Sequence, residues 1–176
     1  MSTVEQREIS IPVGVVVEKR ASRHPWGQPI WEPVSVFSPA PRAEWAVLVE
    51  TEGVVRYHAA TKALVLHRKE TEALVLNLSG PAPELYVVLR PGESGPAFPY
   101  DVHLVTASSY DAQDYEDAGD AVIGKVAMPE PVQALVQAFV AEHHVEEVFK
   151  KRRRDKHDLD AHQFGKMPIF EDPNRR

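Results

Sequence analysis

The chain has 176 residues, no cysteine and a formal net charge of −6. The lack of cysteine excludes disulfides, thiol nucleophiles and cysteine-ligated zinc or iron–sulfur clusters. The charge is uneven, because residues 145–176 carry nine Lys/Arg against seven Asp/Glu, whereas the other 144 residues carry eleven against nineteen. An acidic body disfavours nucleic acid as a partner, since phosphate binding needs an extended basic surface.

The first residues, Met1–Glu8, are polar and lack the basic start and apolar stretch of a signal peptide. The longest wholly apolar runs span only about four or five residues, against about 20 for a helix that crosses a bilayer. We therefore expect a soluble, cytoplasmic protein that makes no membrane contact.

Strand-like patterns fill most of the chain. Apolar residues alternate with others from Ile9 to Val17, which is the period of a half-buried strand. Val54–His58 and Ala63–Arg68 are interpreted as a hairpin around Ala59-Ala60-Thr61. In chain order, nine strands are expected over Ile9–Val17, Ile30–Phe37, Trp45–Glu50, Val54–His58, Ala63–Arg68, Thr71–Leu78, Leu85–Arg90, Val102–Thr106 and Ala121–Val126.

Two segments predict helices. Ser108–Asp117 could form a short one, with Ser108 or Ser109 as its N-cap. Further on the period changes, and apolar residues from Val132 to Val140 fall on one stripe of an α-helix over about residues 129–144. This helix should close one face or one end of the sheet.

These elements predict a mainly β fold of the α+β class, with one C-terminal α-helix. About eight or nine antiparallel strands would roll into a barrel or a strongly bent sandwich. Residues 1–144 would form a single β-rich domain closed by the helix over about 129–144, and residues 145–176 a charged, flexible tail.

No motif in the sequence names a reaction. There is no Gly-rich phosphate loop and no serine in a Gly-x-Ser-x-Gly turn. His143 and Glu147 could share a metal from one helical turn, but the other ligands would have to come from elsewhere. The simpler interpretation is that His143 extends the apolar stripe and His144 caps the helix. We therefore expect no catalytic residue, no metal and no cofactor.

Two features suggest contact with a protein. Lys150–Arg154 is a run of five cations just past the predicted helix, which is either a solvated end or a contact for an acidic partner. Core packing is the default for Trp26, Trp31 and Trp45. Trp26 lies in a turn, so it is expected to be the most exposed of the three and to mark an interface.

Blocks in a set order along the chain resemble a bacterial domain-of-unknown-function family, number 3305. The blocks are Gly14–Arg20, Pro25-Trp26, Trp31–Val34, Leu85–Arg90, Val105–Ser108, Tyr110–Tyr115, Phe139-Val140, His143–Glu147 and Phe149–Arg152. The resemblance implies little chemistry, because none has been assigned to this family. It implies genes that lie beside those of molybdenum-dependent formate dehydrogenases.

Some family members carry a name from the assembly of molybdopterin-guanine dinucleotide. Nucleotidyltransferases of that pathway begin with a Gly-rich loop that feeds a helix and binds phosphate through backbone amides. Here the N-terminal run ends in Glu18-Lys19-Arg20, so that name fits this chain poorly.

The first hypothesis is a non-catalytic accessory or assembly protein that binds a formate dehydrogenase subunit through an acidic surface of that partner. The expected contacts are Trp26, Trp31, His143, His144, Lys150, Lys151, Arg152, Arg153 and Arg154.

The alternative is an enzyme or carrier that acts on the molybdenum cofactor. A barrel mouth could hold such a ligand, with Arg20, Arg56 and Arg90 as the phosphate-binding candidates. A third hypothesis, nucleic-acid binding through the tail, is disfavoured by the acidic body.

Overall fold

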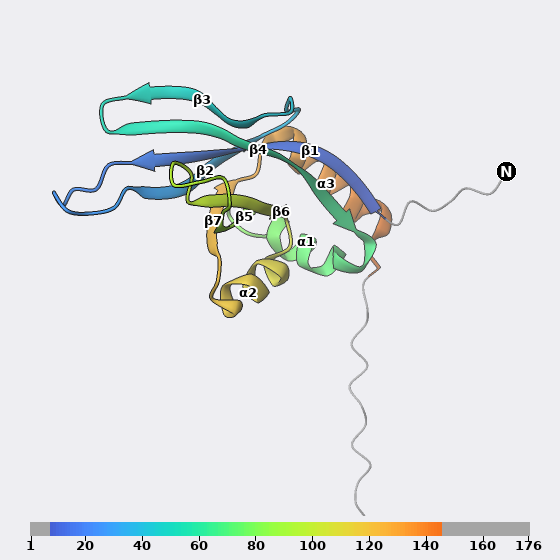
Figure 1. Cartoon of the computed structure of the whole chain (residues 1–176). Helices are drawn as coiled ribbons and strands as arrows, with labels where there is room; N and C mark the ends of the chain where they lie inside the picture. Colours follow the sequence, from blue (N-terminus) through green and yellow to red (C-terminus); the bar gives the residue numbers. More distant parts are fainter. Residues whose placement is uncertain (1–7, 146–176) are drawn as a thin grey trace, which may run out of the picture. The chain divides into compact units, whose positions relative to one another are not determined.

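A computed structural model describes residues 8–145 (Figure 1). Its strands form two antiparallel sheets, one in the order β2-β1-β4-β3 and one in the order β6-β5-β7. The elements of this part are, in chain order, β1 (Glu8–Arg20), β2 (Ile30–Phe37), β3 (Glu44–Thr51), β4 (Val54–His67), a 3₁₀ turn η1 (Arg68–Glu70), α1 (Thr71–Leu78), β5 (Glu84–Pro91), β6 (Tyr100–Thr106), α2 (Ser109–Ala118), β7 (Val122–Ala127) and α3 (Glu130–His143).

β1 is a central strand of the four-stranded sheet. Its alternation places Val13, Val15 and Val17 on one face, where all three are fully buried. Val15 pairs with Val36 of β2 on one side and with Ala60 of β4 on the other. Alternating valines favour this position, because branched side chains pack well on a pleated surface with one buried face.

The three-stranded sheet packs against the same core. Leu85, Val87 and Leu89 of β5 are fully buried and belong to one cluster with the β1 valines. β7 lies against β2, and β6 lies against β4. Gly124 of β7 permits the first of these approaches, because a Cβ there would lie 2.5 Å from the Pro33 Cγ.

Two helices complete the core. Val132, Val136 and Phe139 of α3 are buried at helical spacing, which confirms the predicted stripe. Pro131 lies in the first turn, where a missing amide costs little. α1 packs on α3, and in Figure 1 both helices lie by the part of the sheet where β1 begins and β4 ends.

α2 packs on the three-stranded sheet. The Ser108 Oγ accepts a hydrogen bond from the Asp111 N–H at 3.3 Å, so Ser108 is the N-cap, as predicted. Gly119 ends the helix with a φ of 72°, a conformation that glycine adopts without steric cost. Ala112 is the buried residue of this helix.

The predicted barrel or bent sandwich of eight or nine strands with one helix is wrong. The described residues form seven strands in two separate sheets, with three α-helices. Neither sheet closes on itself, because β3 has only β4 as a hydrogen-bonded neighbour and β6 and β7 each have only β5.

Thr71–Leu78 is a helix, α1, and not the predicted strand. Leu74, Leu76 and Leu78 alternate in sequence, but Leu74 is buried whereas Leu76 is more than half exposed. Burial of Thr71 together with Leu74 instead follows helical spacing. A run of eight residues is too short for its periodicity to decide between the two structures.

The predicted hairpin from Val54 to Arg68 is also wrong, because β4 runs unbroken from Val54 to His67. Its register with β1 shifts between Val15 and Val16, where Ala59 is the extra residue of a β-bulge. The small residues Ala59-Ala60-Thr61, which were interpreted as a turn, instead contain this bulge. This merger and the α1 helix account for the difference between nine expected and seven observed strands.

Candidate functional site

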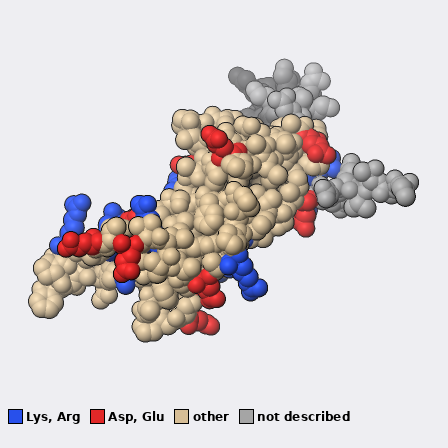
Figure 2. Space-filling model, turned by 90° about the horizontal axis from the view of Figure 1, so that it is seen from above, with Lys and Arg blue, Asp and Glu red and all other residues tan. Residues whose placement is uncertain are grey.

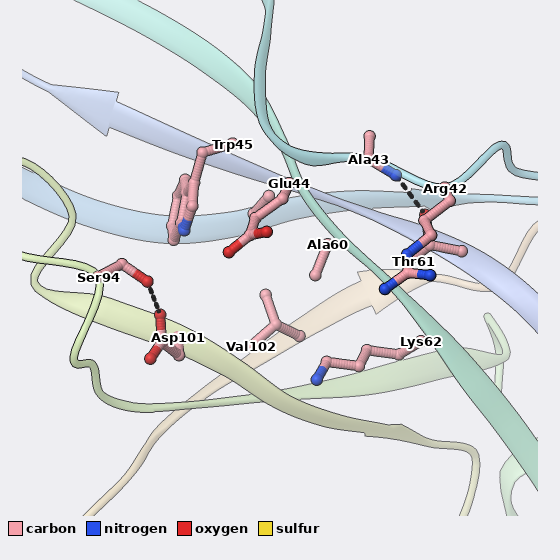
Figure 3. Close-up of a pocket in the computed structure, with 11 residues that line it drawn as sticks. Arg42, Ala43, Glu44, Trp45, Ala60, Thr61, Lys62, Ser94, Asp101 and Val102 are labelled. Carbon is pink, nitrogen blue, oxygen red and sulfur yellow. Dashed lines mark hydrogen bonds between the residues drawn. The ribbon is translucent and has the colours of Figure 1, made fainter.

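A pocket of about 560 Å³ lies where the start of β3, the middle of β4 and the start of β6 meet (Figure 3). Its lining comes from segments far apart in sequence, which the two sheets bring together. The lining residues are Arg42–Trp45, Ala59–Lys62, Ser94, Asp101 and Val102.

The pocket contains charges of both signs. Figure 3 shows Arg42 and Lys62 on one side and Asp101 with Ser94 on the other. Within residues 8–145, Arg42, Lys62 and Glu44 make no ion pair. Two cations without a carboxylate partner leave this side of the pocket able to bind an anionic group.

Asp101 orders the β5–β6 loop, which forms one wall of the pocket. The Ser94 Oγ donates a hydrogen bond to the Asp101 Oδ1 at 2.7 Å, and the Glu93 N–H donates one to the Oδ2 at 3.0 Å. Gly92 is required here, because a Cβ would lie 2.8 Å from the Asp101 N. The pocket lining contains no histidine, so the Ser94–Asp101 pair lacks the base of a Ser-His-Asp triad.

Trp45 forms an aromatic wall. Its φ is 49°, in the left-handed region that bulky side chains rarely adopt. The ring packs on Phe98, Trp31 and Tyr57, with centroid distances of 4.6, 5.8 and 5.9 Å. Such backbone strain persists only where the surroundings hold it, and it concentrates at functional sites.

His58 lies on β4 next to the pocket residues but is 3% exposed. Its Nε2 is 3.0 Å from the Thr61 Oγ1, which donates a hydrogen bond to the Pro41 carbonyl at 2.6 Å. Burial lowers the pKa of His58 below its ordinary value, although a hydrogen bond with the Ala60 backbone opposes this. His58 is therefore a neutral structural side chain at pH 7.

Trp26, a predicted contact, lies in the loop between β1 and β2 and is 89% exposed, as expected for a turn residue. Within this loop, the His24 Nδ1 accepts a hydrogen bond from the Trp26 N–H at 3.3 Å. Trp31 is different, because it is 8% exposed and packs in the aromatic cluster with Trp45 and Tyr57. Its burial places it in the core and not on a contact surface.

His143 and His144 end α3. The His143 ring packs on Phe139 with centroids 4.6 Å apart, so it extends the apolar stripe as predicted. His144 is the C-cap residue, and its N–H donates to the Val140 carbonyl at 2.8 Å. Figure 1 shows the end of α3 and the β1–β2 loop at opposite ends of β1, so the structure does not bring these histidines together with Trp26. Lys150–Arg154 lies outside the described residues.

The three arginines predicted to bind phosphate do not line the pocket. Arg20 pairs with Glu32 at 2.9 Å, and Arg56 pairs with Glu18 at 2.8 Å. Figure 2 shows charges of both signs gathered at the left end of the view, the side on which Figure 1 places the β1–β2 loop.

Arg90 is on the other sheet. Its guanidinium lies over the Tyr115 ring at 5.2 Å and is 3.7 Å from the Asp120 carboxylate. Paired arginines in separate places do not form a common anion site.

Sequence reasoning missed Arg42 and Lys62, which stand alone in the sequence without a spacing that signals a site. It also missed the exposure of β3. The segment Trp45–Glu50 is predicted as a strand, yet Val47, Leu48 and Val49 are 57%, 50% and 47% exposed. The sequence contains no signal of this exposure, because an unbroken apolar run is typical of a strand buried on both faces.

No helix within residues 8–145 has the length and apolar character needed to cross a bilayer. In the same range, no three His, Asp or Glu side chains are grouped as metal ligands would be.

The fold and the pocket define an α+β protein with two packed antiparallel sheets, one of which keeps an open edge at β3. The chain belongs to the family described as protein of unknown function (DUF3305), whose family model matches residues 12–153. This match confirms the resemblance seen in the sequence. No curated protein and no solved structure matches the chain.

Proposed function

We propose that this protein is a non-catalytic accessory protein of the cytoplasm that binds a subunit of a molybdenum-dependent formate dehydrogenase during its assembly. The observation that carries the proposal is the exposed indole of Trp26 on the β1–β2 loop, where its backbone N–H is hydrogen-bonded to His24. Tryptophan is among the residues that contribute most to protein–protein binding, because it buries a large apolar area with few rotatable bonds.

The surroundings of Trp26 support a contact surface. The Ala21 N–H donates to the Gly53 carbonyl at 2.8 Å, so the β1–β2 loop and the β3–β4 turn lie side by side. Ile30, at the end of the same loop, is also exposed. The ion pairs of Arg20 and Arg56 lie on the adjoining strands. An apolar anchor with a polar rim is the usual composition of an interface.

The identity of the partner rests on the gene neighbourhood that the family resemblance implies. The cationic run Lys150–Arg154 adds a second contact in this proposal, with an acidic surface of the same subunit. His143 and His144, which precede that run in the sequence, stay candidate contacts. Trp31 is not a contact in this proposal, because it is buried in the aromatic cluster with Trp45 and Tyr57.

The test is capture of the purified apo formate dehydrogenase subunit by the full chain. Trp26→Ala should weaken binding about 30-fold or more, as loss of a tryptophan hot spot does. Tyr110→Ala is the matched control, because this exposed aromatic lies on α2 and should leave binding unchanged. A chain ending at Val145 should bind more weakly and with less dependence on salt. Unchanged binding by both Trp26→Ala and the shortened chain would contradict the proposal.

The pocket supports a second candidate, a carrier of the molybdenum cofactor. Arg42 and Lys62 could face the phosphates of such a ligand, and Trp45 could stack on a ring system. Added molybdopterin-guanine dinucleotide should then quench tryptophan fluorescence in the wild-type chain and not in the Arg42→Ala/Lys62→Ala variant. Quenching that is equal in both proteins would exclude this pocket as the site.

A further inference from the structure

β3 is an uncovered strand edge. Two open sheets have four edge strands, and within residues 8–145 each of them has one hydrogen-bonded neighbour. β2 packs against β7 and β6 packs against β4, whereas β3 packs closely against β4 alone. The outer backbone N–H and C=O groups of β3 therefore have no further strand beside them in this range. Such groups can pair with an added strand.

The side chains of β3 do little to block an added strand. Natural edge strands are commonly protected by charged side chains, especially Lys, by Pro, by inward-pointing charges or by bulges. β3 has neither Lys nor Pro, and its centre, Ala46–Val49, is aliphatic and exposed. A register shift between Val47 and Val49 makes Leu48 a bulge residue. This bulge restricts pairing to a short stretch on either side of it.

Acidic residues flank the aliphatic centre. Glu44 precedes it, and Glu50 and Glu52 follow it. Within residues 8–145 none of these carboxylates makes an ion pair. The edge therefore combines an apolar middle with negative ends, and it is complementary to a segment with an apolar middle and positive ends.

We propose that β3 binds an extended segment of a partner protein by strand addition, and that this segment is aliphatic at its centre and carries Lys or Arg at its ends. Backbone hydrogen bonds would supply affinity, and the side-chain pattern would supply specificity. A second copy of this chain is a poorer occupant, because antiparallel pairing of two β3 strands would place carboxylates of both copies along one interface. The proposal goes beyond the function proposed above, since it holds whichever protein supplies the segment.

The test uses the full chain and a labelled synthetic peptide in which valine and threonine alternate between two lysines at each end. Fluorescence anisotropy should show saturable binding. The same peptide with glutamates in place of the lysines, or with a central proline, should not bind. Each of Glu44→Gln, Glu50→Gln and Glu52→Gln should weaken binding by about two- to five-fold, the effect of losing an exposed ion pair.

A Val47→Lys/Val49→Lys variant should abolish binding while its circular dichroism spectrum stays that of the wild type. Tyr110→Ala, on α2, should bind the peptide normally. No binding, or equal binding of the lysine and glutamate peptides, would overturn the proposal. Sedimentation that shows a dimer abolished by Val47→Lys/Val49→Lys would also overturn it, in favour of a second copy. Since Trp26 is not part of this edge, Trp26→Ala should bind the peptide as the wild type does, which separates this test from that of the accessory function.

Discussion

The rings of Phe98 and Trp45 stack with centroids 4.6 Å apart and an angle of 17° between their planes. Phe98 belongs to the β5–β6 loop, and Trp45 lies at the start of β3. The stack therefore joins the two sheets at the edge of the pocket. It also holds Trp45 in its left-handed backbone conformation.

Removal of the Phe98 ring should weaken the junction between the sheets. Phe98→Ala is expected to lower the free energy of unfolding by about 1–3 kcal/mol, less than for a fully buried phenylalanine because Phe98 is partly exposed. Urea titration followed by tryptophan fluorescence measures this. Phe98→Leu keeps most of the apolar contact and should lose less than half as much. A Phe98→Leu variant as stable as the wild type would show that stacking adds nothing to the contact.

The stability of the fold should depend on pH through His58. Burial lowers the pKa of His58 in the folded chain, so the unfolded chain takes up a proton first, near the ordinary value of 6.5. As the pH falls through 6.5, the free energy of unfolding should therefore decrease, until the folded form is protonated as well. Urea titrations between pH 8 and pH 5 measure this slope.

The variant His58→Gln tests this slope. It should reduce the loss of stability below pH 6.5, although its stability at pH 8 will also be lower. The assignment to His58 fails if the slope persists unchanged in His58→Gln.

Asn77 ties the end of α1 to the three-stranded sheet. Its Nδ2 donates hydrogen bonds to the carbonyls of Glu84 and Ala107 at 2.7 and 2.8 Å, and its Oδ1 accepts one from the Glu84 N–H at 3.0 Å. Asn77→Ala should cost about 2–4 kcal/mol of stability, because partly buried backbone groups lose their partners. Asn77→Asp should cost at least as much, since a carboxylate cannot donate to two carbonyls. A milder effect of Asp than of Ala in thermal unfolding would contradict these contacts.

Gly124 and Pro33 should be energetically coupled, because they set the approach of β7 to β2. A Cβ at position 124 would lie 2.5 Å from the Pro33 Cγ, so Gly124→Ala should destabilise the fold by about 1–3 kcal/mol. Pro33→Ala removes that ring atom and should recover part of the loss in the double variant. A double-mutant cycle from urea titrations gives the coupling. Strict additivity would mean that the two strands adjust independently.

The local elements were largely predictable from the sequence. The alternation over Ile9–Val17 and the helical stripe from Val132 to Val140 identified β1 and α3, because both segments are long enough for their period to show. Ser108 signalled the start of α2 through its capping side chain. Short or uniform runs gave no clear period. The sequence therefore could not distinguish a helix from a strand at Thr71–Leu78, or a bulge from a turn at Ala59-Ala60-Thr61.

The arrangement of the strands was not predictable in the same way. A division into two open sheets depends on which strands pair, and that is decided by contacts far apart in the chain. The pocket shows the same limit, since Arg42, Lys62 and Asp101 converge only through the neighbouring positions of β4 and β6. The exposure of Trp26 was predictable, because a side chain in a surface turn has little core to pack against. Trp31 lies in a strand, and its side chain is on the buried face.

We propose that the chain binds a formate dehydrogenase subunit through the end that bears Trp26. Hydrogen–deuterium exchange of the full chain, with and without the purified apo subunit, is the test of this proposal. Our account predicts slower exchange in the β1–β2 loop, residues 21–29, with little change in α2. Exchange that is unchanged throughout the chain, or slowed only around the pocket residues Arg42 and Lys62, would contradict it.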